Sequence, residues 1–370
     1  MAGPQQGAIT TMAWFFVLAI ALTCANVATA RAAQGSESIY RQKEAKLVEV
    51  MKIGGGPEES DDDPPFVRPR DMRVASDGSI YVLDGEASEV VVFDRDGKSR
   101  FRFSRNGEGP GELGQPNCIA IDHFDRIVCY EFGNRRFSLF SKHGKFIRSN
   151  KFQDNVSSFC YLPDGRILAL AARDHFAPGA KENIWTLCVK DSSFHVTARL
   201  DSITSSFEVL STNSGTMMTS RPFEPSLYWS VSPEGRIAFA SSSDYRITVL
   251  SPKFARLRTI SRQVPAVNIS GAERADYLKD VSEIMASHLK FPDHKPPLEG
   301  LYCDSQGYLL VNRAVGWKQM PLIDVYSPDG SLVGELEVPG FRRPVFDGDT
   351  MLMRVFKDDE LPAVIRYRLE

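Results

Sequence analysis

The feature that most constrains the fold is a hairpin that recurs along the chain. Its first copy runs from Met72 to Val82, where an Asp77-Gly78 turn separates an apolar strand from a second β-rich strand. Glycine suits this turn because a tight hairpin needs a residue with positive φ. Two successive hairpins make a four-stranded antiparallel sheet, and serial sheets of this kind are typical of a β-propeller. Further copies occupy residues 119–129, 159–169, 229–239 and 301–311, and second hairpins have turns near residues 96, 143, 191, 252 and 329.

The two ends of the chain determine the number of blades. After five complete units, residues 350–356 and 363–369 supply only later strands of a sixth sheet. Its outer strand is expected from Lys46 to Ile53, because the Gly-x-Gly-Pro-x-Glu loop that follows at 54–59 repeats the loop at 107–112. Pairing the two ends would remove a free sheet edge. We therefore predict an all-β fold, a six-bladed β-propeller of four-stranded antiparallel blades closed by an N-terminal outer strand.

Two insertions interrupt the repeat. Residues 202–225 are rich in Ser and Thr and predict an extended excursion between the third and fourth blades. Residues 270–290 predict an amphipathic helix across one face, with Ser270 as its N-cap. The apolar residues at helical spacing in this insertion are Ala275, Leu278, Val281, Ile284, Met285 and Leu289.

The N-terminus predicts export. An apolar run at 12–25, followed by small residues that end at Ala30, indicates a signal peptide over residues 1–30 and a periplasmic or extracellular protein. No Lys or Arg precedes the run, which leaves an uncleaved anchor open. The run is short for a membrane span, and none is expected in the mature chain, where residues 44–370 form a single propeller domain.

The charge balance bears on the class of partner, and the cysteine spacing bears on disulfides and zinc sites. The chain carries 44 Lys and Arg against 47 Asp and Glu, without a basic block, so no nucleic acid partner is expected. The cysteines show no CxxC spacing and fit neither a disulfide scaffold nor a zinc site. Cys118 and Cys129 fall on consecutive predicted strands at similar distances from their turn, so oxidation of this pair stays open in an exported protein.

The residues carry a family resemblance. The loop at 107–113 followed by 116–122 resembles the blade connection of secreted bacterial six-bladed β-propellers related to NHL-repeat proteins. The insertion that ends at 292–296 ahead of 301–307 is also similar to theirs, and the resemblance covers residues 46–370. It implies the fold and leaves the activity open, because propellers host many unrelated functions.

The sequence shows none of the common catalytic or nucleotide-binding motifs. It contains no Gly-x-Ser-x-Gly elbow, Walker loop or His-Glu-x-x-His motif. The glycine-rich loops at 54–59 and 107–112 follow predicted outer strands and precede no helix, so they are interpreted as turns and not as phosphate cradles. His288 and His294 are the only close histidines, at a spacing typical of a solvated surface. No cofactor is therefore predicted.

Three functional hypotheses follow. The first is a monomeric binding or scaffold module for a peptide, glycan or protein partner. The second is a metal-dependent, lactonase-like hydrolase or lyase with its site in the central channel; resemblance to such propellers implies Ca or Zn under this reading alone. The third is a structural component of the cell envelope. The candidate ligand contacts, chosen as cationic or aromatic residues near inner strands or their loops, are Arg313, Trp317, Arg221 and Tyr302.

Overall fold

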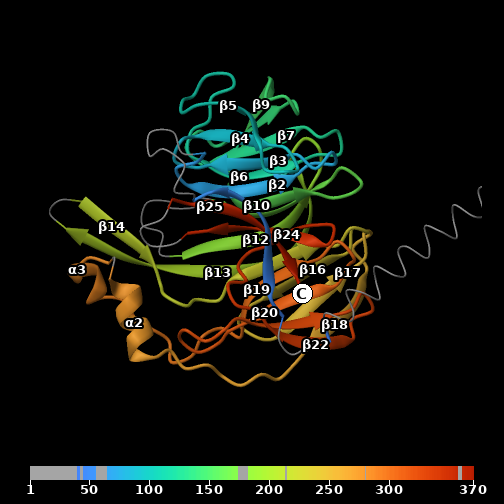
Figure 1. Ribbon diagram of the computed structural model, residues 1–370. Coiled ribbons are helices and arrows are strands. Elements are labelled where there is room, and N and C mark those ends of the chain that lie inside the picture. The colour runs from blue at the N-terminus through green and yellow to red at the C-terminus, as the bar shows by residue number, and fades with distance from the viewer. Residues whose placement is uncertain are drawn as a thin grey trace, which may run out of the picture.

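The computed structural model describes residues 40–41, 45–55, 65–173, 182–212, 215–279, 281–356 and 361–370. These residues form a six-bladed β-propeller whose blades are antiparallel sheets (Figure 1), which confirms the predicted fold. The predicted signal peptide at 1–30 lies outside the described residues. No helix in the described part of the chain has the length and apolar character to cross a membrane.

Each blade is built from strands that follow one another in the sheet. The first three blades are β2 (Pro69–Val74), β3 (Ile80–Asp84), β4 (Glu89–Phe93) and β5 (Ser99–Phe103); β6 (Pro116–Ile121), β7 (Ile127–Glu131), β8 (Arg136–Phe140) and β9 (Phe146–Lys151); and β10 (Asn155–Tyr161), β11 (Ile167–Ala172), β12 (Glu182–Lys190), β13 (Val196–Thr212) and β14 (Gly215–Ser220). The last three are β15 (Leu227–Val231), β16 (Ile237–Ser241), β17 (Arg246–Leu250) and β18 (Arg256–Ser261); β19 (Leu298–Cys303), β20 (Leu309–Arg313), β21 (Leu322–Tyr326) and β22 (Leu332–Glu337); and β23 (Val345–Asp347), β24 (Thr350–Val355), β25 (Ala363–Leu369) and β1 (Leu47–Gly54).

Apolar side chains on both faces of each sheet hold the ring together. Successive residues of a strand point to opposite faces, so Ile80 and Val82 of β3 pack against blade six while Tyr81 and Leu83 pack against blade two. The same alternation recurs around the ring, and the buried apolar residues of the described chain form one cluster at every interface between neighbouring blades. Burial on both faces explains why the inner strands lack the polar face of a sandwich strand.

The ring closes as the sequence predicts. β1 pairs antiparallel with β25, from Leu47 opposite Leu369 to Gly54 opposite Ala363. This places β1 at the outer edge of blade six, where the blue N-terminal colour meets the red C-terminal colour in Figure 1. The sheet also contains β23, a three-residue inner strand that the sequence pattern does not reveal.

The two insertions differ from their predicted forms. The segment after β12 is a hairpin, because β13 continues far beyond the blade and returns as β14, the fifth strand of blade three. The predicted single helix is two short helices, α2 (Gly271–Leu278) and α3 (Glu283–Ala286). Ser270 caps the first as expected, but Ser282 caps the second and so interrupts the helix. The expected apolar stripe is therefore only partly buried: Met285 and Leu289 are buried, whereas Ala275 and Ile284 are exposed.

The strand register excludes a disulfide between Cys118 and Cys129. Cys118 lies opposite Tyr130, and Cys129 lies opposite Ile119, so the two thiols are offset by one residue. A one-residue offset puts side chains on opposite faces of a sheet. Cys118 accordingly packs toward blade three and Cys129 toward blade one, and both thiols are free.

Closure by β1 predicts a specific loss of stability. Ile53 is 4% exposed and packs between blades six and one, so Ile53→Ala should lower the free energy of unfolding by about 2 to 5 kcal/mol in a urea titration. Val50 lies on the same strand with 48% of its surface exposed, and Val50→Ala should change that free energy by about 0.5 kcal/mol or less. Equal effects of the two substitutions would contradict closure through a buried β1.

Candidate functional site

All long connections of the propeller lie on one face. The first turn of every blade and the third turn of blades one to five are tight hairpins, so the second turns and the connections between blades emerge on the other side. This side carries the β13–β14 hairpin, both helices and the loop between β20 and β21, and we call it the loop face. Figure 1 shows β14, α2 and α3 together at one side of the molecule. Binding residues of a rigid scaffold concentrate on such connections.

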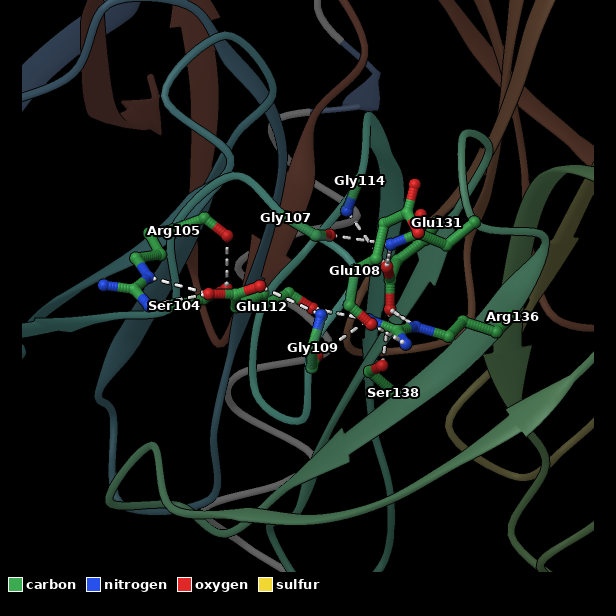
Figure 2. A network of polar contacts seen from close by, with 11 residues as sticks. Ser104, Arg105, Gly107, Glu108, Gly109, Glu112, Gly114, Glu131, Arg136 and Ser138 are labelled. Atoms are coloured by element: carbon green, nitrogen blue, oxygen red, sulfur yellow. Dashed lines mark hydrogen bonds and ion pairs between the residues drawn. The ribbon is translucent and has the colours of Figure 1, made fainter.

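The glycine-rich loop that enters blade two is anchored by a buried glutamate (Figure 2). Glu131, at the end of β7, accepts hydrogen bonds from the Gly114 backbone N–H at 3.0 Å and from the Asn134 amide at 2.6 Å. Its other oxygen accepts from Arg136 Nε at 2.8 Å and from the Ser138 hydroxyl. Arg136 in turn donates to the carbonyl oxygens of Glu108, Gly109 and Glu112, so one ion pair fixes the whole loop.

The same loop has no free backbone cradle for a phosphate. Glu112 Oε2 accepts from the Gly109 N–H at 2.9 Å, and Gly107 N–H donates to the Leu113 carbonyl at 3.3 Å. Hydrogen bonding to Gly109, and then to Arg105, holds the pKa of Glu112 below its ordinary value. The Glu112 carboxylate therefore occupies the place that a phosphate would take in such a loop. This agrees with the interpretation of the glycines as turn residues.

Loss of the Glu131 charge should destabilise the loop. Glu131 is fully buried and its partner Arg136 keeps only 13% of its side chain exposed, so Glu131→Gln leaves a nearly buried guanidinium without a counter-charge. We expect a loss of about 3 to 5 kcal/mol in the free energy of unfolding, measured by urea titration. Glu108→Gln is the matched control in the same loop, since the Glu108 side chain is exposed; it should change the free energy by about 0.5 kcal/mol or less. An equal loss in both variants would contradict this role.

Four arginines converge where blade six meets blade one, beside the propeller axis. The arginine cluster comprises Arg70, Arg73, Arg343 and Arg354. Two of its members lie on the inner strand β2, one precedes the inner strand β23, and one lies near the loop-face end of β24. Arg354 reaches across the blade boundary, where its guanidinium donates to the Pro69 carbonyl at 3.4 Å.

The positive charge of the arginine cluster is largely uncompensated. Asp71 forms an ion pair with Arg73 at 2.6 Å and also accepts from the Ile119 N–H at 3.0 Å. Arg70 donates to the neutral Asn117 side chain at 2.9 Å, and Arg343 makes no ion pair with any residue that the structure describes. Four guanidinium groups thus share one carboxylate, which is itself already bonded.

The pKa of the Arg354 guanidinium reflects this excess of positive charge. Burial lowers the pKa of Arg354 below its ordinary value. Asp71 opposes this shift, and the charges of Arg343, Arg73 and Arg70 add to it. Like charges disfavour one another's charged forms, and perturbed groups of this kind concentrate at functional sites.

Two tyrosines and a glutamate adjoin the arginine cluster on the neighbouring inner strands. Burial raises the pKa of Tyr302 to about 12 and also raises that of Tyr228, and Arg343 and Glu299 act on both phenols. The Tyr302 ring packs edge-on against Phe341, with the ring centroids 5.8 Å apart. Each phenol therefore lies near both Glu299 and Arg343 of the arginine cluster.

Glycine at position 300 allows Tyr302 to adopt this position. A Cβ at residue 300 would lie 2.5 Å from Tyr302 Oη, closer than nonbonded atoms approach. The phenol thus folds back over its own strand, toward the axis. Gly300 is required here for close approach, and not for an unusual backbone angle.

The structure places the four sequence candidates differently. Tyr302 lies beside the arginine cluster. Arg313 ends β20 and is bonded to the buried Asp324 at 3.4 Å, within a network that also holds Arg262. Trp317 is half-buried on the loop between β20 and β21, and Arg221 pairs with Glu208 at 2.8 Å near the β13–β14 hairpin. Only Tyr302 of the four thus joins the charged groups at the axis.

The described residues do not fit a metal centre. No group of three or more His, Cys, Asp or Glu side chains lies together in the part of the chain that the structure describes. Asp71 and Glu299, the carboxylates near the axis, are accompanied by arginines, whose charge opposes a bound cation. The chemistry of this site therefore favours an anion.

A pocket lies on the opposite face, between the hairpin turns of blades one and two. It has a volume of about 510 Å³, and its charged lining residues are Asp77, Asp94, Lys98, Arg100 and Lys142. These groups serve the turns themselves: Asp94 accepts from the Lys98 N–H at 2.9 Å, and the Lys142 carbonyl accepts from the Tyr81 hydroxyl at 2.8 Å. The pocket has no comparable excess of one charge.

Known proteins with similar sequences match only part of their own length. NHL repeat-containing protein 3 of Homo sapiens is 27% identical over 132 residues, which cover 34% of this chain and 38% of that protein. A probable peptidyl-alpha-hydroxyglycine alpha-amidating lyase of Caenorhabditis elegans is 25% identical over 153 residues, or 40% of this chain and 43% of that protein. The chain thus spans less than half the length of these curated relatives.

Fold comparison and a family model agree with the observed ring. A solved structure of a candidate exported protein from Bacteroides fragilis superposes with a TM-score of 0.53 at 12% identity, covering 88% of this chain and 95% of that one, and so shares the fold. The model of the family described as 6-bladed beta-propeller matches residues 39–231, more than half of the 370-residue chain. The protein therefore belongs to the 6-bladed beta-propeller family DUF5128.

Proposed function

We propose that this protein is an exported binding module that holds an anionic group of a peptide, glycan or protein partner at the arginine cluster. One observation carries the proposal: four guanidinium groups converge beside the axis and share a single, already bonded carboxylate. Clustered charges lower the stability of a folded protein unless a counter-charge offsets them. A cluster that the fold itself does not neutralise is explained by a bound anion.

Arginine is suited to this role. Its planar guanidinium binds carboxylate, sulfate or phosphate through paired hydrogen bonds. Arg70 and Arg343 are exposed on the loop face, so a ligand reaches them from solvent. Tyr302 adds a phenol next to Arg343, and aromatic and arginine side chains together are enriched at recognition surfaces. Trp317 and Arg221, on connections of the same face, are proposed as outer contacts of a larger partner.

Two further parts of the proposal are export, which rests on the sequence, and a monomeric state, which rests on the strand pairing. Export is supported by the apolar run at 12–25 and the small residues that follow it. A monomer is supported by the closed ring, in which β1 covers the edge of blade six that would otherwise be open to a second chain.

Anion binding predicts an unusual combination of effects for Arg354→Gln. The substitution removes one of four mutually repelling charges, so the unliganded protein should unfold at the same or a higher urea concentration. Binding of sulfate, measured by calorimetry at constant ionic strength, should weaken about tenfold or more, since a hydrogen bond to a charged group contributes about 1.5 to 3 kcal/mol. Arg343→Gln should weaken binding similarly.

Arg148→Gln is the matched control, because Arg148 is exposed on the outer strand β9, far from the axis in the sheet order. It should leave sulfate affinity unchanged. The proposal fails if the wild-type protein binds neither sulfate nor acetate, or if Arg354→Gln destabilises the unliganded protein and leaves affinity intact, since a purely structural arginine would behave in that way.

A further inference from the structure

One carboxylate lies close to the two tyrosines that adjoin the arginine cluster. Glu299, the second residue of β19, forms no hydrogen bond or ion pair with any residue in the described ranges. Burial raises the pKa of its carboxyl group above the ordinary value, Lys295 and Arg342 oppose this shift, and Glu273 adds to it. The carboxylate is nevertheless more than a third exposed, so it meets solvent on the loop face.

Tyr302 lies close to both this carboxylate and Arg343, whose charges both act on its phenol. Its ring rests on Phe341, and it folds over Gly300, the residue next to Glu299. Tyr228 on the adjacent inner strand interacts with both Glu299 and Arg343. Both phenols thus lie near one positive and one negative charge, those of Arg343 and Glu299.

A buried ion pair fixes the segment that leads to Glu299. Lys295 Nζ lies 2.5 Å from Glu273 Oε1 of α2, and both side chains are less than 10% exposed. Lys295 also donates to the Val315 carbonyl at 2.8 Å. The direct partners of Lys295 are therefore Glu273 and Val315, so this lysine acts on Glu299 only from a distance, and the helical insertion holds it in place.

From these two opposite charges we infer that the ligand is a zwitterion, an amino acid or short peptide whose carboxylate binds the arginine cluster and whose ammonium group binds Glu299. The inference rests on the proposed anion site and adds a second, oppositely charged subsite beside the tyrosines. A ligand with a carboxylate alone would leave Glu299 without a partner and would gain nothing from its position.

The test uses the full-length mature chain and glycine, triglycine and pentaglycine as probes of increasing length, titrated by calorimetry. The probe that binds most tightly is then compared with its N-acetyl derivative and its C-terminal amide. We expect N-acetylation and amidation each to weaken binding at least tenfold. Glu299→Gln should weaken binding of the zwitterion at least tenfold and leave the affinity of the N-acetyl derivative unchanged. Glu86→Gln, an exposed glutamate on the loop between β3 and β4, is the matched control and should change neither.

The outcomes separate this inference from the proposed function. If the N-acetyl probe binds as tightly as the zwitterion, or if Glu299→Gln weakens both probes equally, the ammonium subsite is wrong while anion binding stands. If acetate and sulfate bind and none of the glycine probes binds more tightly than acetate, the zwitterion is likewise refuted. If no anion binds at all, the proposed function itself falls.

Discussion

Burial of both faces of every sheet is the constraint on which this structure depends. In blade one the odd and even residues of β3 belong to different apolar clusters, and the same division recurs in each blade. The strands inside each sheet are buried on both faces, while the outer strands β5, β9 and β18 are largely exposed, so the deviations from the repeat lie in the connections and at the axis. The loop face therefore carries the inserted hairpin, the helices and the charged groups, while the opposite face consists of tight turns.

Local patterns made most of the ring predictable. Apolar alternation and turns such as Asp77-Gly78 depend on neighbouring residues, so the hairpins could be predicted from local sequence. The repeated Gly-x-Gly-Pro-x-Glu loop predicted the position of β1. Features with short or ambiguous patterns were missed. β23 has only three residues, and Ser282 divides the helical insertion by a capping contact that competes with an otherwise continuous helical pattern. The register of Cys118 and Cys129 needed the residue-by-residue pairing.

The candidate site was predictable only in part. Tyr302 was selected as an aromatic residue near an inner strand. Arg313 was selected as a cationic residue in a loop after an inner hairpin strand, whereas it ends β20 and is bonded to Asp324. The arginine cluster was missed because Arg70 and Arg354 lie at opposite ends of the chain, and only ring closure brings them together. One member of the arginine cluster could have been placed near the axis from the sequence. Arg343 immediately precedes Pro344 and the inner strand of the sixth blade, β23.

The arginine cluster straddles the seam between the first blade and the last. Arg70 belongs to one side of this seam, Arg354 belongs to the other, and the contact of Arg354 with the Pro69 carbonyl crosses it. An anion bridging these guanidinium groups would link the last blade to the first. Occupancy would then slow unzipping of the ring from its ends, so that resistance to proteases and to mechanical pulling becomes a property of the loaded protein.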